Sequence, residues 1–136
     1  MLEIYDKYYD IHASDIGHYF RNMYHIVEYI DSSPYFSLIT SSKDFFQQKD
    51  YMKILRAQLT NNEIACLAVN GLSTRGFAFR PLIEKYQLLR NLHFDINITK
   101  YGYLACVPAP EILINAYPHL KSVFEQQNSK KKQSGA

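Results

Sequence analysis

Residues 14–31, SDIGHYFRNMYHIVEYID, decide the fold because they carry the clearest helical pattern in the chain. Their apolar members recur at the i, i+3, i+4, i+7 spacing of one helix face, which predicts an amphipathic helix with that face in the core. The face consists of Ile16, Tyr19, Phe20, Met23, Ile26, Val27 and Ile30. Ser14 is the expected N-cap, and the helix should end before Pro34 because the residue before a proline avoids the α region.

The opposite face of this helix is polar. It carries His18, Arg21, Asn22, His25 and Glu28, at spacings of three and four residues that align side chains along a helix. This polar stripe is the first candidate for a functional site.

The length and composition indicate one packed domain. The chain has 136 residues, of which 47% are hydrophobic, with 12 Tyr and 8 Phe but no Trp. A chain of this size and composition buries a sizeable core without disulfide or metal staples. We expect a single domain over residues 1–127, followed by a flexible polar and basic tail over residues 128–136.

The charge and the cysteines narrow the function class. The formal net charge is only +2, so the sequence does not show the strongly basic character that is typical of a nucleic-acid-binding protein. Cys66 and Cys106 are too few for a disulfide framework and are expected to be small core residues, so a reducing cytoplasm fits best. No run approaches the roughly 20 apolar residues of a membrane span. We therefore expect membrane attachment only through a part that this chain does not contain.

Four further stretches have helical patterns, over residues 44–59, 61–70, 81–92 and 111–124. Thr60 and Glu63 have the spacing of a capping box at the start of the second, and Gly71 is its expected left-handed C-terminal residue. The last pattern is interrupted at Tyr117-Pro118, which allows two short helices or one kinked helix. Residues 94–103 alternate instead, as in a small hairpin or an irregular crossing segment. The prediction is a mainly α fold, a compact bundle of about five helices with one irregular or small β segment.

Three separated signatures carry a family resemblance. They are His18-Tyr19-Phe20-Arg21 with Tyr24; Ile54-Leu55-Arg56-Ala57-Gln58-Leu59 with Glu63 and Asn70; and Leu82-Ile83-Glu84-Lys85-Tyr86 with Leu89, Asn91 and Leu92. In this order and at these separations, residues 9–94 resemble the phage abortive infection (AbiC-like) proteins of bacteria. The resemblance implies a component of an anti-phage defence system.

The polar members of these signatures are the candidate site. Arg21 is expected either to pair with an acid such as Glu63 or Glu84, since a buried arginine must be paired, or to bind a phosphate or a partner's carboxylate. The same two roles are expected for Arg56, and the two arginines are expected to share one polar seam between helices. The predicted seam or binding surface comprises His18, Arg21, Arg56, Gln58, Glu63, Asn70, Glu84 and Lys85.

The histidines of the polar stripe do not predict a metal site. His18 and His25 lie seven residues apart, about 10 Å along a helix, too far to hold one ion together. Arg21 and His25 invite comparison with the Arg-x4-6-His motif of the HEPN ribonucleases, although only three residues intervene here. At i, i+4 the two side chains share a helix face, so acid/base work on RNA is chemically conceivable.

We expect no cofactor, because the sequence contains no complete set of acid/base or ligand residues. The favoured role is an effector or interaction module that binds a protein partner or associates with itself. Two alternatives stay open: a HEPN-like RNA-cleaving toxin using Arg21 and His25, and a helical adaptor without toxicity.

Overall fold

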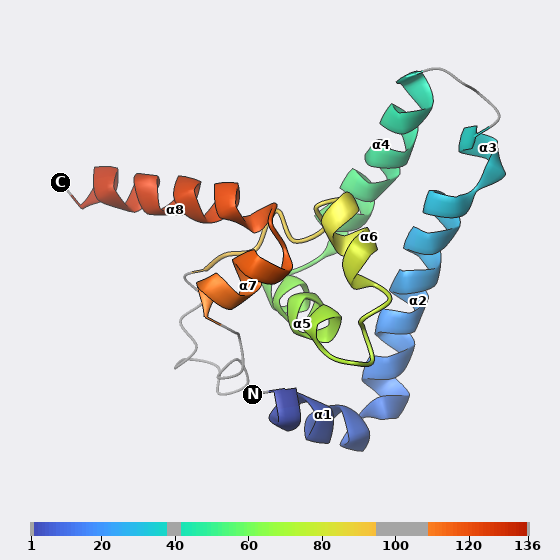
Figure 1. Cartoon of the computed structure of the whole chain (residues 1–136), viewed down its shortest axis with the longest axis horizontal. Coiled ribbons are helices and arrows are strands. Elements are labelled where there is room, and N and C mark those ends of the chain that lie inside the picture. The colour runs from blue at the N-terminus through green and yellow to red at the C-terminus, as the bar shows by residue number, and fades with distance from the viewer. Residues whose placement is uncertain (1, 38–41, 95–108, 136) are drawn as a thin grey trace.

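The computed structural model describes residues 2–37, 42–94 and 109–135 (Figure 1). These residues are mainly α-helical, as predicted, and contain no strand. The helices are α1 (Leu2–Ile11), α2 (Ala13–Ser32), α3 (Pro34–Ser37), α4 (Ser42–Gln58), α5 (Asn61–Leu72), α6 (Arg80–Lys85), α7 (Pro110–Ala116) and α8 (Leu120–Ser134). The expected count of about five helices is not confirmed, because several short helices join the long ones. The predicted β segment at residues 94–103 lies, except for Phe94, outside the described residues.

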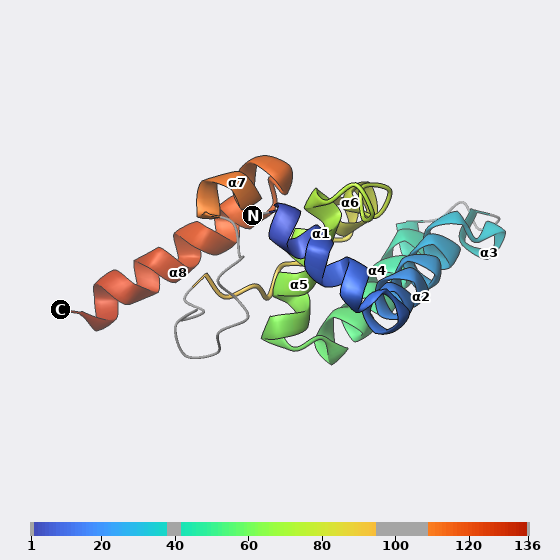
Figure 2. The same ribbon diagram turned by 90° about the horizontal axis from the view of Figure 1, so that it is seen from below.

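The helices surround α5, which lies at the centre of the molecule (Figure 1). Helices α2 and α4 run side by side in both views and are connected through α3, so that they form a two-helix arm (Figures 1 and 2). Helix α1 lies beside the start of α2, and α7 and α8 lie on the side away from the arm. Helix α8 projects outward to the C-terminus. No helix in the described ranges has the length and apolar character needed to cross a membrane.

The core-facing side of α2 is narrower than its sequence pattern predicts. Phe20, Met23 and Val27 are buried, with 6%, 4% and 0% of their surface exposed. Tyr19 and Ile26, which we expected in the core, are instead 37% and 50% exposed. The apolar stripe is therefore wider than the part of the helix that the rest of the chain covers.

The start of α2 also differs from the prediction. The helix begins one residue before Ser14, and His12 occupies the N-cap position without a side-chain capping hydrogen bond. Ser14 is therefore not the cap. The reason is that α1 leads almost directly into α2, and backbone groups of the connecting residues, such as the Ile16 N–H and the His12 carbonyl, hydrogen-bond to each other.

Helix α5 begins with the predicted capping box. The Glu63 backbone N–H donates to Thr60 Oγ1 at 3.3 Å, and the Thr60 N–H donates to Glu63 Oε2 at 2.8 Å. The expectation for Gly71 is wrong, because this residue lies inside the helix, which continues to Leu72. Glycine is required there by packing, since a Cβ atom would lie 2.2 Å from the hydroxyl oxygen of Tyr117.

Helix α6 begins at Arg80, one residue before the start at Pro81 that the sequence predicts, and it is shorter than the predicted helix over residues 81–92. It ends at Lys85 because Gln87 adopts a positive φ of 50°. The Gln87 N–H bonds to the Glu84 carbonyl at 3.1 Å and the Leu88 N–H to the Ile83 carbonyl at 3.0 Å, which is the Schellman arrangement of a helix C-terminus. The turns that follow keep their leucines in the core; Leu88, Leu89 and Leu92 are at most 1% exposed.

The C-terminal stretch forms two helices that complete the core, because Tyr117-Pro118 separates α7 from α8. Leu113, Tyr117 and Leu120 are fully buried among the side chains of α5 and α6. The Gln127 side chain donates to the Leu92 carbonyl at 2.8 Å and accepts from the Phe94 N–H at 3.1 Å. Helix α8 continues to Ser134, so most of the stretch that we expected to be a flexible tail is helical.

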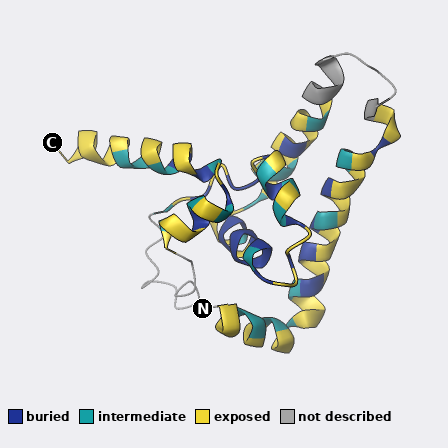
Figure 3. Cartoon of the chain, viewed as in Figure 1, coloured by how far each residue is buried: buried dark blue, intermediate teal, exposed yellow. Residues whose placement is uncertain are grey.

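Burial is concentrated on α5 and on the sides of α2, α6, α7 and α8 that face it (Figure 3). Cys66 is an exception on α5 because it is exposed, although we expected a core position. The core therefore joins the N-terminal and C-terminal parts of the chain around one central helix.

Candidate functional site

Arg21 lies on α2 with its side chain exposed to solvent. The described residues offer it no hydrogen bond and no ion pair, so the expected pairing with Glu63 or Glu84 is not found there. Both of these acids have other partners. Arg21 is therefore available on the surface to a charge from another molecule.

Glu63 is held by the capping box described above. Its carboxylate accepts hydrogen bonds from the Thr60 backbone N–H and hydroxyl, both at 2.8 Å, and these bonds lower its pKa. Its role in the structure is therefore to begin α5.

Glu84 binds the C-terminal part of the chain through His119. Glu84 Oε1 accepts the His119 backbone N–H at 3.1 Å, and Oε2 contacts Nδ1 of the same imidazole. The His119 side chain is only 4% exposed, and its Nε2 has no partner among the described residues. Sequence reasoning missed His119 because a separation of 35 residues leaves no periodic signal.

Lys85 and its neighbour Tyr86 both bind Asp31 at the end of α2. The Lys85 ammonium and the Tyr86 hydroxyl donate to Asp31 Oδ1 at 2.5 and 2.6 Å. Partial burial opposes ionisation, but the two hydrogen bonds outweigh it and lower the pKa of Asp31. Asp31, which the sequence marked only as a helix end, therefore fastens α2 to α6.

Arg56 stabilises the turn after α6. Its guanidinium donates to the Gln87 carbonyl at 3.3 Å, and burial together with the nearby Arg90 lowers its pKa. Arg56 and Arg21 have no hydrogen-bond partner in common among the described residues. The two arginines therefore do not form one polar seam through shared contacts.

Asn70 joins α5 to α1. It is 3% exposed, and its side-chain nitrogen donates to the Tyr5 hydroxyl at 2.9 Å. Burial raises the pKa of Tyr5 to about 12. The remaining predicted seam residues, His18 and Gln58, are exposed on α2 and α4. The members of the predicted seam that have partners thus serve in separate contacts within the chain.

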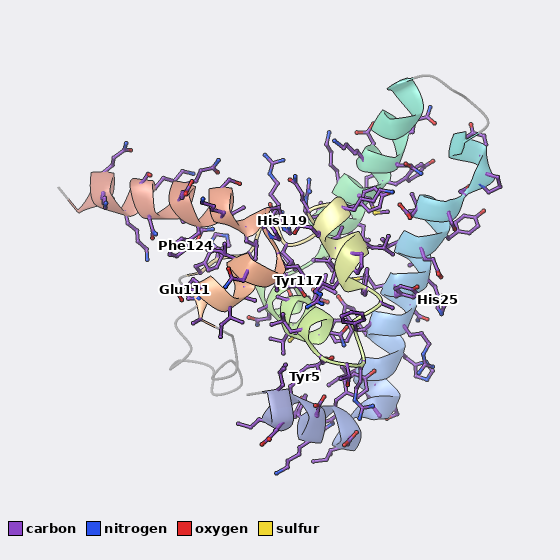
Figure 4. The ribbon with its side chains drawn as sticks, viewed as in Figure 1. Tyr5, His25, Glu111, Tyr117, His119 and Phe124 are labelled. Atoms are coloured by element: carbon purple, nitrogen blue, oxygen red, sulfur yellow. The ribbon has the colours of Figure 1, made fainter. Side chains whose placement is uncertain are left out.

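The exposed side of α2 carries a small polar network. Glu28 accepts a hydrogen bond from the Tyr24 hydroxyl at 2.9 Å and lies 3.3 Å from His25 Nδ1. Figure 4 shows His25 on α2, on the side of the molecule opposite to α7 and α8. Arg21 precedes His25 by four residues, one helical turn away. This network offers an imidazole oriented by a carboxylate, together with a cation.

A groove runs beside this network over α2, α3 and α4. Its volume is about 870 Å³, and it is lined by Asn22, His25, Ile26, Tyr29, Ile30, Ser33, Tyr35 and Tyr51. Tyr29 is 73% exposed and Tyr35 is 62% exposed. Adjoining exposed apolar side chains of this kind mark surfaces that contact other molecules. Sequence reasoning missed the groove because it assigned Ile26 to the core.

The described residues contain no group of three or more His, Cys, Asp or Glu side chains that could hold a metal ion. The groove, which His25 lines, is the strongest candidate site on the described surface because it is the exposed apolar hollow beside the polar network of α2.

One family model matches the chain. The family is described as "Putative phage abortive infection protein" (putAbiC), and the match covers residues 11–96. This range contains α2 to α6 and the whole groove. No curated protein and no solved structure matches the chain.

Proposed function

The chain belongs to this family of phage abortive infection proteins, and we propose that it serves in anti-phage defence as an interaction module. The site of interaction is the groove over α2, α3 and α4. A single observation carries the proposal: a contiguous apolar and aromatic surface lies exposed within the range that the family model matches.

The contacts of the signature residues support this role. Glu63, Asn70, Glu84 and Lys85 bind other parts of the same chain, and these contacts hold α1, α2, α5, α6 and the start of α8 in place. They hold a scaffold together, whereas the groove residues remain accessible. A rigid helical scaffold that presents an exposed aromatic groove is suited to binding a protein surface.

A plaque assay tests the proposal in a host in which the native gene cluster restricts phage. The double variant Ile26→Ser, Tyr29→Ser should lose most of the protection, because the groove loses its apolar contact area. Ile112→Ser is the matched control, since Ile112 on α7 is 49% exposed and lies away from the groove. Circular dichroism should show that both proteins fold. Full protection by the folded groove variant would refute the proposal.

An RNA-cleaving toxin is the second candidate. It is favoured by the His25–Glu28 contact and by Arg21 on the next turn, which together could move a proton and stabilise a phosphate. Total RNA from arrested cells distinguishes the two functions. The interaction module leaves RNA intact, whereas cleavage that disappears in Arg21→Ala, His25→Ala would establish the ribonuclease. If expression changed neither growth nor phage yield, the non-toxic adaptor would be favoured.

A further inference from the structure

Two arginines meet at one carbonyl oxygen where the last turns of α4 lie beside α6 (Figure 1). The Gln87 carbonyl accepts a hydrogen bond from Arg56 Nη1 at 3.3 Å and another from the Arg90 backbone N–H at 3.1 Å. The turn after α6 therefore holds Arg90 close to the Arg56 guanidinium. Arg56 follows Tyr51 by five residues, about 140° around α4, and neither arginine lines the groove. The pair is thus separate from the groove.

No carboxylate compensates these two charges. Neither Arg56 nor Arg90 forms an ion pair within the part of the chain that the structure describes. Glu84 on α6 and Asp31 at the end of α2 are held by other partners. Burial and the charge of Arg90 both lower the pKa of Arg56, so the positive charge of Arg56 is unfavourable where it stands.

The two side chains are equipped to bind an anion. A partly buried guanidinium is costly unless it is paired, and here the chain supplies no acid. Arg56 uses Nη1 for the Gln87 carbonyl, which leaves most of its N–H donors for a ligand. The Arg90 side chain is exposed, so it can turn toward the same ligand. Forked guanidinium groups match the oxygens of a phosphate, which they bind in bidentate fashion.

The surroundings favour one phosphate group over a nucleic-acid backbone. A backbone is bound by a row of cations that contact successive phosphates. Lys53, three residues before Arg56 on α4, is already paired with Asp50 at 3.3 Å. The formal net charge of the whole chain is only +2. An isolated pair of arginines therefore suits a terminal phosphate, which carries up to about two negative charges at neutral pH.

We propose that Arg56 and Arg90 form a binding site for the terminal phosphate of a small ligand, either a nucleotide or free inorganic phosphate. The site lies between the last turn of α4 and the turn that follows α6. The bound phosphate neutralises both guanidinium groups and thereby ties α4 to this turn. The proposal goes beyond the proposed function and does not rest on it, because the groove takes no part in the site.

Isothermal titration calorimetry of the full chain at constant ionic strength tests the site. The probes are inorganic phosphate and adenosine monophosphate, with adenosine as the uncharged control. Arg90→Gln should weaken binding of both phosphates about tenfold or more, because a charge-assisted hydrogen bond is lost. Arg90→Lys keeps the charge without the fork and should give an intermediate affinity. Lys130→Gln removes the same charge from the exposed outer part of α8 and should bind like the unmodified chain.

The test depends on Arg90 because its exposed side chain can be replaced without loss of folding, which circular dichroism checks. Equal affinity for the two phosphates supports recognition of the phosphate group alone, and tighter binding of the nucleotide supports a site that extends beyond it.

Three results would overturn the proposal. The first is that neither phosphate binds, or that adenosine binds as tightly as the nucleotide. The second is equal binding by the folded Arg90→Gln and Lys130→Gln proteins, which would leave the arginines as partners of helix-end carbonyls only. The third is binding of a short RNA but of neither small phosphate, which would make the pair a nucleic-acid contact. None of these results changes the outcome expected in the plaque assay.

Discussion

Gly71 tests whether the C-terminal helices are packed as tightly as the structure shows. A Cβ atom at this position would lie 2.2 Å from the Tyr117 hydroxyl oxygen and 3.1 Å from Ile83 Cδ1. Tyr117 cannot easily move away, because it is fully buried and its hydroxyl donates to the Ala68 carbonyl at 2.8 Å. Gly71→Ala therefore forces a methyl group into occupied space.

The size of the effect follows from two opposing contributions. Alanine in place of glycine inside a helix stabilises by about 1 kcal/mol, whereas overpacking a rigid core costs about 1–3 kcal/mol. With a rigid neighbour the cost should lie in the upper part of its range, at about 2–3 kcal/mol, so after the gain of about 1 kcal/mol Gly71→Ala should lower the free energy of unfolding by about 1–2 kcal/mol. Tyr117→Phe removes the clashing oxygen and leaves Cζ of the ring at 3.3 Å. It should cost about 1 kcal/mol by itself for the lost hydrogen bond.

Urea unfolding followed by circular dichroism measures all four proteins of this double-mutant cycle. Because the phenylalanine relieves the clash, Gly71→Ala should be neutral or stabilising in the Tyr117→Phe background, giving a coupling free energy of about 2 kcal/mol. Gly135→Ala, at the exposed end of α8, is the control and should change stability by less than about 0.5 kcal/mol. Additive effects of the two substitutions would refute the packing described here.

Three further outcomes are expected. Asp31→Asn should lower the free energy of unfolding by about 1–2 kcal/mol at neutral pH, because Lys85 and Tyr86 donate to the carboxylate. Because folding lowers the pKa of Asp31, its contribution to stability is complete above its ordinary pKa and disappears as the pH falls through the folded value. The free energies of unfolding of Asp31→Asn and the unmodified chain should therefore converge as the pH is lowered. Glu125→Gln, exposed on α8, is the control and should show no such pH-dependent difference. At Gln87, whose φ is 50°, glycine should be tolerated in urea unfolding while valine should cost about 1–2 kcal/mol, and equal stabilities would contradict the left-handed conformation. Thr60→Ala should cost about 1 kcal/mol in thermal unfolding by removing the α5 cap, and an unchanged melting temperature would show that the cap is dispensable.

The candidate site was predicted in part. The exposed stripe with Arg21 and His25 was recognised from its spacing on one helix, and the structure places both side chains on the surface. The shared polar seam was assembled from signatures whose members turn out to have separate partners, such as His119 for Glu84 and the Gln87 carbonyl for Arg56. Spacing along the chain describes which residues share a helix face, but it contains no information about which faces meet.

The sequence by itself determined the local features of this protein: its helical class, the capping box at Thr60, the start of α6 next to Pro81, the break before Pro118 and the family to which residues 11–96 belong. Each depends on residues within a few positions of one another. The tertiary structure alone decided that Tyr19 and Ile26 face outward, that Gly71 accommodates Tyr117, and that Glu84 binds His119. These outcomes depend on how distant helices pack, because an apolar side chain becomes core only where another part of the chain covers it.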